Sequence, residues 1–291
     1  MSNITGLLTE GFGSFYTVEV DGKLYEARAR GRLKKDGIRL LIGDRVTLEK
    51  EQEVYAITGI EPRKNELIRP AVANIDSIVV VIAAASPDPN FKQTDKLLAF
   101  LEYHGLDVSI CINKTDLADY EDIKETYEKA GYKVVTTSSE SDCTQLLEIL
   151  RNKVSAFAGC SGVGKSTLIN AIDDEFERET GSVGKIKRGR HTTTHTKLLP
   201  LKCGGYIADT PGFSVVDLTK IEAEDLHMYF REFKKYEDKC KFYGCTHTSD
   251  KNCEVYAQVT QGNISASRYE SYLSLYEELN SIYKVYPRKE K

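Results

Sequence analysis

Gly159-Cys-Ser-Gly-Val-Gly-Lys-Ser-Thr167 is the stretch around which this 291-residue chain is organised. It matches G-x-x-x-x-G-K-[ST] without a gap, between a short apolar run, Val154–Ala158, and a helical pattern, Ser166–Ile172. In such a strand–loop–helix unit, backbone N–H groups converge on an anion at the helix N-terminus. The sequence therefore predicts a phosphate-binding loop formed by Gly159, Cys160, Ser161, Gly162, Val163, Gly164, Lys165, Ser166 and Thr167.

Two side chains of this loop have distinct expected roles. Lys165 would reach the β- and γ-phosphates, and the Ser166 hydroxyl would ligate Mg²⁺. A glycine-rich turn can also join a strand to a helix without binding a ligand. However, Gly-Lys-Ser at this offset rarely arises from packing alone, so we expect a nucleotide and Mg²⁺ here.

Asn113-Lys114-Thr115-Asp116 indicates which base is bound. It follows the apolar run Leu106–Ile112, so we expect it at the carboxyl end of a strand, where doubly wound sheets bind ligands. A carboxylate at Asp116 can accept the N1–H and the exocyclic amine of guanine, which adenine does not offer. We expect Asn113 to tie this loop to the phosphate loop, and the Lys114 stem to lie along the base. N-K-x-D alone is a weak signal, but together with the phosphate loop it predicts GTP and GDP as ligands.

Two loops downstream resemble the switches of GTPases. Asp209-Thr-Pro-Gly212 follows a strand end and resembles the Mg²⁺-side switch, in which Asp209 would hold Mg²⁺ through water and the Gly212 N–H would sense the γ-phosphate. Residues 189–195 resemble the first switch, where a threonine closes on Mg²⁺. The sequence leaves open which threonine does so: Thr192, Thr193 or Thr194.

The order of these segments is unusual. Val135–Ser139 resembles the loop that backs the guanine, which places Ser138 and Ser139 beside the base. Here the guanine reader and its backing loop precede the phosphate loop, whereas in ordinary small GTPases the phosphate loop comes first. A circular permutation of one doubly wound sheet explains this order, because domain termini usually lie close together at the surface.

Composition limits the class of protein. The chain is 41% apolar and 29% charged with a net charge of −4, which is typical of a globular protein without a global basic field. The N-terminus lacks a signal-peptide pattern, and the longest apolar run, Ile78–Ala85, is too short to span a bilayer. Seven scattered cysteines indicate a reducing compartment. We therefore expect a cytoplasmic protein with no membrane partner.

Residues 1–66 predict a small β-barrel. Five strand-like runs are separated by turn signals, and the oligonucleotide-binding (OB) fold is the first choice for such a module. The runs are Ile4–Thr9, Phe15–Val20, Lys23–Arg30, Arg45–Lys50 and Val54–Ile60. Basic residues cluster at the third run and the loop after it: Arg28, Arg30, Arg32, Lys34, Lys35 and Arg39. A solvated charged face is the common outcome for such a cluster, but on a barrel of this kind we expect RNA contact.

Residues 67–218 alternate apolar strands with helical segments, which predicts a doubly wound α/β domain. Residues 219–291 predict a helical module that contains Cys240-x₄-Cys245-x-His247-x₅-Cys253. Three thiolates and one imidazole at this spacing are typical of a closed, structural Zn²⁺ site. We expect helices over Glu222–Tyr236, Glu254–Gln261 and Ala266–Tyr283, the last with a tyrosine stripe that favours packing over RNA contact.

A five-strand barrel, a permuted GTPase and this cysteine–histidine module, in this order, resemble the bacterial ribosome small-subunit-dependent GTPase A family over essentially the full chain. The resemblance implies GTP hydrolysis that is stimulated by the small ribosomal subunit during late maturation of the 30S particle. It also implies docking of the barrel and the zinc module on 16S rRNA. We expect a monomer, one Zn²⁺ and no DNA partner.

Phe213 stands where ordinary small GTPases keep the glutamine that orients the attacking water. A phenyl ring cannot hydrogen-bond water, so another group must take that role. His191 corresponds to a histidine that the family keeps before its threonines and is the candidate catalytic residue, with His195 and Arg190 as alternatives. Two other functions stay open: a scaffold whose nucleotide state only gates docking, and a metal-handling GTPase, which the closed ligand set disfavours.

Overall fold

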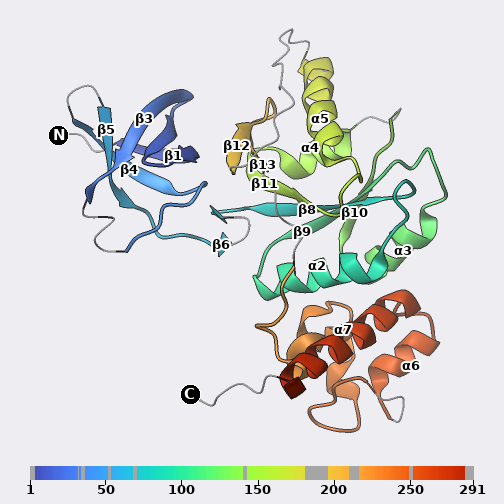
Figure 1. Cartoon of the computed structure of the whole chain (residues 1–291). Coiled ribbons are helices and arrows are strands. Elements are labelled where there is room, and N and C mark those ends of the chain that lie inside the picture. The colour runs from blue at the N-terminus through green and yellow to red at the C-terminus, as the bar shows by residue number, and fades with distance from the viewer. Residues whose placement is uncertain are drawn as a thin grey trace. The chain divides into compact units, whose positions relative to one another are not determined.

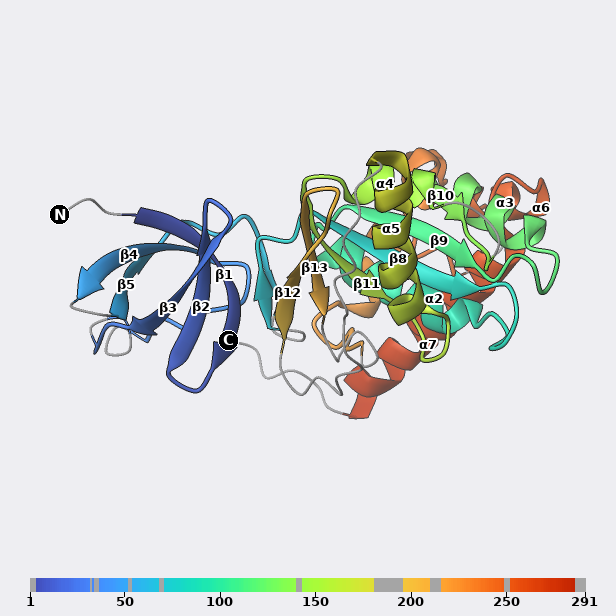
Figure 2. The ribbon, with the colours of Figure 1, turned by 90° about the horizontal axis from the view of Figure 1, so that it is seen from above.

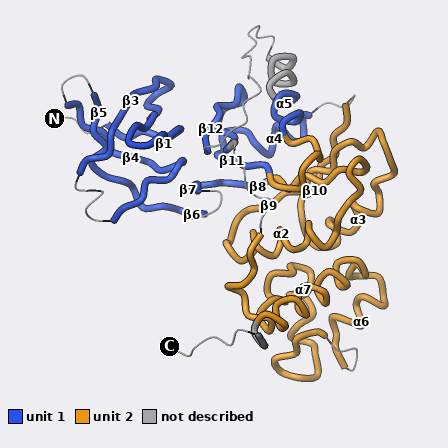
Figure 3. Tube along the Cα trace, viewed as in Figure 1, with its two compact units in different colours: residues 1–78, 143–157, 166–213 blue, residues 79–142, 158–165, 214–291 orange. Residues whose placement is uncertain are grey.

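A computed structural model of the chain describes residues 4–31, 33, 37–51, 54–67, 71–139, 143–180, 196–209, 216–248 and 252–285 (Figure 1). The chain forms two compact units (Figure 3). The first contains residues 1–78, 143–157 and 166–213, and the second contains residues 79–142, 158–165 and 214–291. The central α/β part of the chain therefore contributes to both units.

The first unit contains the predicted barrel. Its strands are β1 (Ile4–Phe12), β2 (Phe15–Val20), β3 (Lys23–Ala29), β4 (Arg45–Glu51) and β5 (Val54–Ile60). β1 pairs with both β2 and β4, β4 pairs with β5, and β5 returns in parallel to β3, so the five strands close on themselves. Alternate side chains fill the interior, including Leu8, Val18, Ala27, Leu48 and Ile57. The prediction of a five-strand barrel is confirmed.

The turn Gly43-Asp44 before β4 is fixed from inside the same unit. Asp44 is fully buried, and its carboxylate accepts hydrogen bonds from Leu41 N at 2.7 Å and Arg63 Nε at 2.7 Å. Gly43 has a φ of 93°, and a Cβ there would lie 2.1 Å from the Ala73 carbonyl oxygen. Only glycine therefore fits this close approach of two backbone segments.

The first unit also contains further strands, and the sequence did not predict those at residues 66–67, 72–73 and 197–200. β6 (Glu66–Leu67) and β7 (Val72–Ala73) form a short ladder at and just after the expected linker. β12 (Lys197–Pro200) runs antiparallel to β13 (Gly205–Asp209), side by side in Figure 2. β13 pairs in parallel with β11 (Lys153–Ala158), the strand that leads to the phosphate loop. This unit also contains α4 (Thr144–Leu150) and all but the first residue of α5 (Lys165–Thr180).

In the second unit, β9 (Val108–Asn113) lies between β8 (Ser77–Ala83) and β10 (Lys133–Thr136). Every residue of β8 and β9 is buried, as expected for predominantly apolar runs in a parallel sheet covered on both faces. The helices of this part are α2 (Phe91–Tyr103) and α3 (Glu121–Lys129). α2 lies between these strands and the C-terminal helix α7 (Ala266–Val285) (Figure 1).

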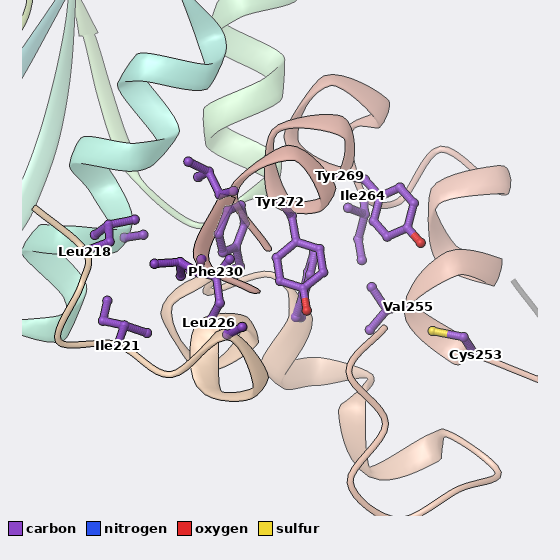
Figure 4. Packing of buried hydrophobic residues seen from close by; sticks show 14 residues of the cluster. Leu218, Ile221, Leu226, Phe230, Cys253, Val255, Ile264, Tyr269 and Tyr272 are labelled. Atoms are coloured by element: carbon purple, nitrogen blue, oxygen red, sulfur yellow. The ribbon is translucent and has the colours of Figure 1, made fainter. Parts of the chain in front are cut away.

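The C-terminal module corrects one prediction. A single helix over Glu222–Tyr236 is wrong, because the segment forms short 3₁₀ turns: η1 (Ala223–Tyr229), η2 (Phe233–Lys235) and η3 (Glu237–Lys239). The backbone is extended at Phe230, which ends η1 and lets both Phe230 and Phe233 enter one core. That core also receives Tyr269 and Tyr272 of α7 (Figure 4), so these two tyrosines of the stripe pack as expected. α6 (Glu254–Thr260) completes the module.

A buried charge network attaches the module to α2. Arg268 of α7 is 1% exposed and donates to Asp95 Oδ1 at 2.6 Å and to Glu232 Oε1 at 2.7 Å. Its guanidinium carbon lies 4.5 Å from the centre of the Phe230 ring. Because Asp95 and Glu232 are also buried, each depends on Arg268 for compensation of its charge.

Candidate nucleotide and metal sites

The phosphate loop has a backbone that only glycine can follow. Gly159, Gly162 and Gly164 have φ values of 134°, 83° and 101°. A Cβ at Gly159 would lie 2.3 Å from the carbonyl oxygen of Val81 in β8. The glycines of the motif therefore serve both the left-handed turns and the close approach to a neighbouring strand.

Asn113 joins the guanine-reading loop to the phosphate loop. Its Nδ2 donates to the Val163 carbonyl at 2.9 Å, and its Oδ1 accepts from the Thr137 hydroxyl at 3.0 Å. The Asn113 side chain is buried, and a Cβ on Gly164 would lie 2.3 Å from its Nδ2. The expected tie between the two loops is therefore present, and Thr137 anchors it to the end of β10.

Lys114 makes a second connection between the same loops. Its backbone has a φ of 61°, and its Nζ donates to the Gly162 carbonyl at 2.8 Å and to the Ser86 carbonyl. The side chain therefore extends from the guanine-reading loop to the phosphate loop. Sequence reasoning missed Ser86, because nothing in its local pattern indicates a contact with residues so distant in the chain.

Asp116 is exposed and oriented by a neighbouring loop. The Ser139 hydroxyl donates to Asp116 Oδ2 at 3.2 Å. Thr115 donates through both its N–H, at 3.3 Å, and its hydroxyl, at 3.2 Å, to the Thr137 carbonyl. The segment Val135–Ser139 therefore supports the N-K-x-D loop, and it places Ser139 beside Asp116.

Lys165 lies folded over its own loop. Its Nζ donates to the carbonyls of Gly159 at 2.8 Å and Cys160 at 2.7 Å. Burial lowers the pKa of the Lys165 ammonium, so its charge lacks full solvation. An anion placed in this loop would restore that solvation, which matches the phosphate-binding role expected from the motif.

The remaining predicted nucleotide residues are less fully described. Ser166 and Thr167 are exposed at the start of α5, and Asp209 ends β13, while nothing is described of its side chain. The other candidates lie outside the described residues: Arg190, His191, Thr192, Thr193, Thr194, His195, Gly212 and Phe213.

The cysteine–histidine motif forms a compact cluster. Cys240, Cys245, His247 and Cys253 each place one ligand atom within 4.8 Å of the others. His247 Nδ1 lies 3.6 Å from Cys240 Sγ and 3.5 Å from Cys253 Sγ. The cluster therefore has the geometry of a site that could hold one metal ion.

The surrounding backbone holds the cluster in place. Tyr269 and Tyr272 donate their hydroxyls to the carbonyls of His247, at 2.8 Å, and Thr246. These bonds hold the chain where His247 adopts a φ of 57°. Two N–H groups donate to sulfur: Glu254 N to Cys240 Sγ at 3.3 Å and Tyr256 N to Cys253 Sγ at 3.5 Å. Such bonds would also stabilise thiolates.

Burial sets the protonation of the cluster. It raises the pKa of the Cys253 thiol to about 12 and lowers that of His247 to about 4, the latter with a contribution from His227. His247 is therefore neutral, as a metal ligand must be. A bound cation would instead displace the thiol proton of Cys253, so metal binding would release protons.

Comparison with known proteins identifies the family. The sequence matches the RsgA N-terminal domain over residues 5–57 and the RsgA GTPase over residues 60–219. The chain belongs to the RsgA GTPase family. One RsgA relative, the small ribosomal subunit biogenesis GTPase of Agathobacter rectalis, is 42% identical over 96% of this chain and 99% of its own. A second, from Alkaliphilus metalliredigens, is 41% identical over 94% of this chain and 97% of its own.

Solved RsgA-type structures share the whole architecture. The crystal structure of YloQ, a circularly permuted GTPase, superimposes with a TM-score of 0.80 at 32% identity, covering 99% of this chain and 98% of that one. YjeQ from Thermotoga maritima gives a TM-score of 0.81 at 32% identity over 99% and 100% of the two chains. This chain is therefore a GTPase of the circularly permuted type. None of the helices in its described part is long and apolar enough to cross a membrane.

Proposed function

We propose that this chain hydrolyses GTP as an assembly factor in late maturation of the small ribosomal subunit, and that the 30S subunit accelerates hydrolysis. The observation that carries the proposal is the match, over 94–96% of the chain, to GTPases named for small ribosomal subunit biogenesis. This chain has the barrel, the permuted GTPase part and the metal cluster. A cytoplasmic location follows from a role in ribosome assembly.

GTP would bind across the two loops joined by Asn113. Asp116, oriented by Ser139, would accept both donors of the guanine edge, while the backbone N–H groups of residues 159–167 would surround the phosphates. Lys165 would exchange its carbonyl partners for phosphate oxygens. Mg²⁺ would be held by Ser166, by Asp209 through water and by a first-switch threonine, and it would neutralise charge on the β- and γ-phosphate oxygens.

The attacking water would be oriented by His191. Phe213 occupies the position of the usual glutamine and offers no hydrogen bond, so the role falls to a neighbouring loop. His191 lies beside the threonines of that loop in the sequence. Docking on the 30S subunit would stabilise the closed arrangement of the loop and would thereby accelerate hydrolysis.

The metal cluster would hold one structural Zn²⁺. With Zn–S bonds of about 2.3 Å and Zn–N bonds of about 2.0 Å, a tetrahedral zinc ion separates a sulfur from a nitrogen ligand by about 3.5 Å. The two sulfur–nitrogen separations around His247, 3.5 Å and 3.6 Å, match this value. Cys245→Ser should therefore abolish stoichiometric zinc and increase hydrogen exchange in residues 237–260, while GTP binding is retained.

The barrel would contact 16S rRNA. Arg28 is exposed on β3 and lies over the Phe15 ring at 4.5 Å, so it presents a charge and a flat aromatic surface together. Such a pair suits a phosphate and an unpaired base. Arg30 differs, because it pairs with Glu49 at 2.9 Å and Glu51 at 3.2 Å, while Arg32 lies outside the described residues.

Phosphate release under multiple turnover, with purified 30S, 50S or 70S particles, tests the proposal. We expect strong stimulation by 30S subunits alone. Equal rates with and without 30S subunits would favour a scaffold whose nucleotide state only gates docking.

Single-turnover hydrolysis on saturating 30S subunits should fall about 10²–10⁴-fold for His191→Ala, with His195→Ala as the matched control. Parental turnover by His191→Ala would assign the role to another group.

A further inference from the structure

His227 and Glu237 form a polar pair beside the metal cluster. His227 Nδ1 lies 3.2 Å from Glu237 Oε2, and the ring of His227 lies 5.1 Å from that of His247 at an interplanar angle of 80°. The two residues belong to different turns, η1 and η3. Together with His247 they place one ligand-type atom each within 4.8 Å of the others.

The two nitrogens of His247 have different surroundings. Nδ1 faces the sulfurs of Cys240 and Cys253, whereas Nε2 is buried and has no hydrogen-bond partner among the described residues. If Nδ1 gives its lone pair to a metal, the neutral ring must carry its proton on Nε2. A buried N–H without an acceptor is costly, and metal-bound histidines almost always donate this hydrogen to a partner.

His227 can supply that acceptor, and Glu237 sets its tautomer. A carboxylate only accepts, so the bond between Glu237 and His227 requires the proton to lie on His227 Nδ1. The other ring nitrogen of His227, Nε2, then carries a lone pair. The hydrogen bonds then run in one direction only: His227 Nδ1–H donates to the Glu237 carboxylate, His247 Nε2–H donates to His227 Nε2, and His247 Nδ1 is left to bind the metal.

We propose that His227 and Glu237 are positioning residues that orient His247 and raise the metal affinity of the Cys240–Cys245–His247–Cys253 site. The inference rests on the metal site proposed above. When a metal binds at His247 Nδ1, the free nitrogen of the His227 ring, whose centre lies 5.1 Å from that of His247, accepts the hydrogen of His247 Nε2. Glu237 acts through His227, because its carboxylate accepts the Nδ1 hydrogen of that ring and so leaves Nε2 as the acceptor.

Zinc affinity of the full-length protein, measured by competition with a chromophoric chelator, tests this relay. His227→Ala should weaken zinc binding about 10–100-fold. His227→Gln should keep most of the affinity, because an amide can donate to Glu237 and accept from His247. Glu237→Ala should weaken binding, whereas Glu224→Ala, which removes an exposed acid from the same cleft, should not.

The double variant distinguishes a relay from a general loss of structure or charge. Because Glu237 acts through His227, the double variant His227→Ala/Glu237→Ala should bind zinc about as well as His227→Ala alone. Parental affinity in His227→Ala, or fully additive losses, would overturn the relay while leaving the zinc site intact. Two zinc ions in the parent, one of them lost in His227→Ala, would instead make the pair ligands of a second metal. A parent that binds no zinc overturns both the metal site and the relay.

Discussion

Gly164→Ala should uncouple the guanine reader from the phosphate loop. The new Cβ would lie 2.3 Å from Asn113 Nδ2, so the Asn113 side chain must move by about 1 Å to reach ordinary contact distance. That movement breaks the 2.9 Å bond to the Val163 carbonyl and disturbs the 3.0 Å bond from Thr137. The variant also places a side chain at a φ of 101°.

The expected magnitude separates into two parts. Backbone strain at a positive φ costs about 1–2 kcal/mol for an alanine. Loss of a hydrogen bond that leaves a buried amide unpaired costs about 1–3 kcal/mol more. If GTP binds only the ordered loop, both free-energy costs weaken GTP binding, and each 1.4 kcal/mol raises the Kd about tenfold.

Gly162→Ala is the matched control. Gly162 has a φ of 83°, but a Cβ there would meet only Pro87 Cδ, at an ordinary 3.7 Å. Titration with a fluorescent GTP analogue should therefore show an extra loss of about 5–150-fold for Gly164→Ala over Gly162→Ala. In an Asn113→Ala background most of that extra loss should disappear, because the group that clashes has been removed. Equal losses for the two glycine variants, or no coupling to Asn113, would refute the reasoning.

Three further outcomes follow from other parts of the chain. Asp116→Asn should weaken GTP binding and relax discrimination against xanthosine nucleotides, since an amide reverses the donor pattern facing the base; parental GTP affinity would contradict the guanine assignment. Arg28→Ala should weaken 30S association and lower the slope of its affinity against salt concentration, on logarithmic scales, by about one. Arg30→Ala should have a smaller effect, because Arg30 is already paired with Glu49 and Glu51. Equal slopes for the two variants would place the RNA contact elsewhere. Arg268→Met should destabilise the C-terminal module by about 3–5 kcal/mol, because two carboxylates stay buried without compensation. Burial raises the pKa of Asp95 even beside Arg268, so the carboxyl of the folded variant retains a proton that the unfolded chain releases. The loss of stability, measured by hydrogen exchange, should therefore be greater at pH 8 than at pH 5.

The elements that the sequence predicted well are those with strong local signals. The runs that became β8 and β9 are predominantly apolar, and both strands are wholly buried. Among the turn signals that separate the five strand-like runs, Gly43-Asp44 contains a glycine that no other residue could replace. The spacing of Cys240, Cys245, His247 and Cys253 predicted a cluster that the fold does assemble. In each case the physical requirement lies within a few residues of sequence.

The elements that were missed depend on distant contacts. The segment Glu222–Tyr236 has helical periodicity, but burial of Phe230 and Phe233 in one core favours short turns over a continuous helix. β12 is only four residues long, and it exists as a strand because β13 pairs with it. The partnership of His227 with Glu237 beside His247 arises only when η1, η3 and the cysteine loop are folded together. The local sequence pattern does not indicate these contacts.

Asn113 and Lys114 show why a permuted chain can keep the same nucleotide site. Both belong to the guanine-reading loop, yet their side chains bind Val163 and Gly162, 50 and 48 residues later in the chain. These bonds depend on the carboxyl ends of parallel strands lying at one edge of a sheet, and that arrangement does not depend on which strand is synthesised first. Because the two side chains hold the base-reading and phosphate-binding loops together, base recognition and phosphate binding should respond to the same substitutions. Gly164→Ala is the change that tests this coupling most directly.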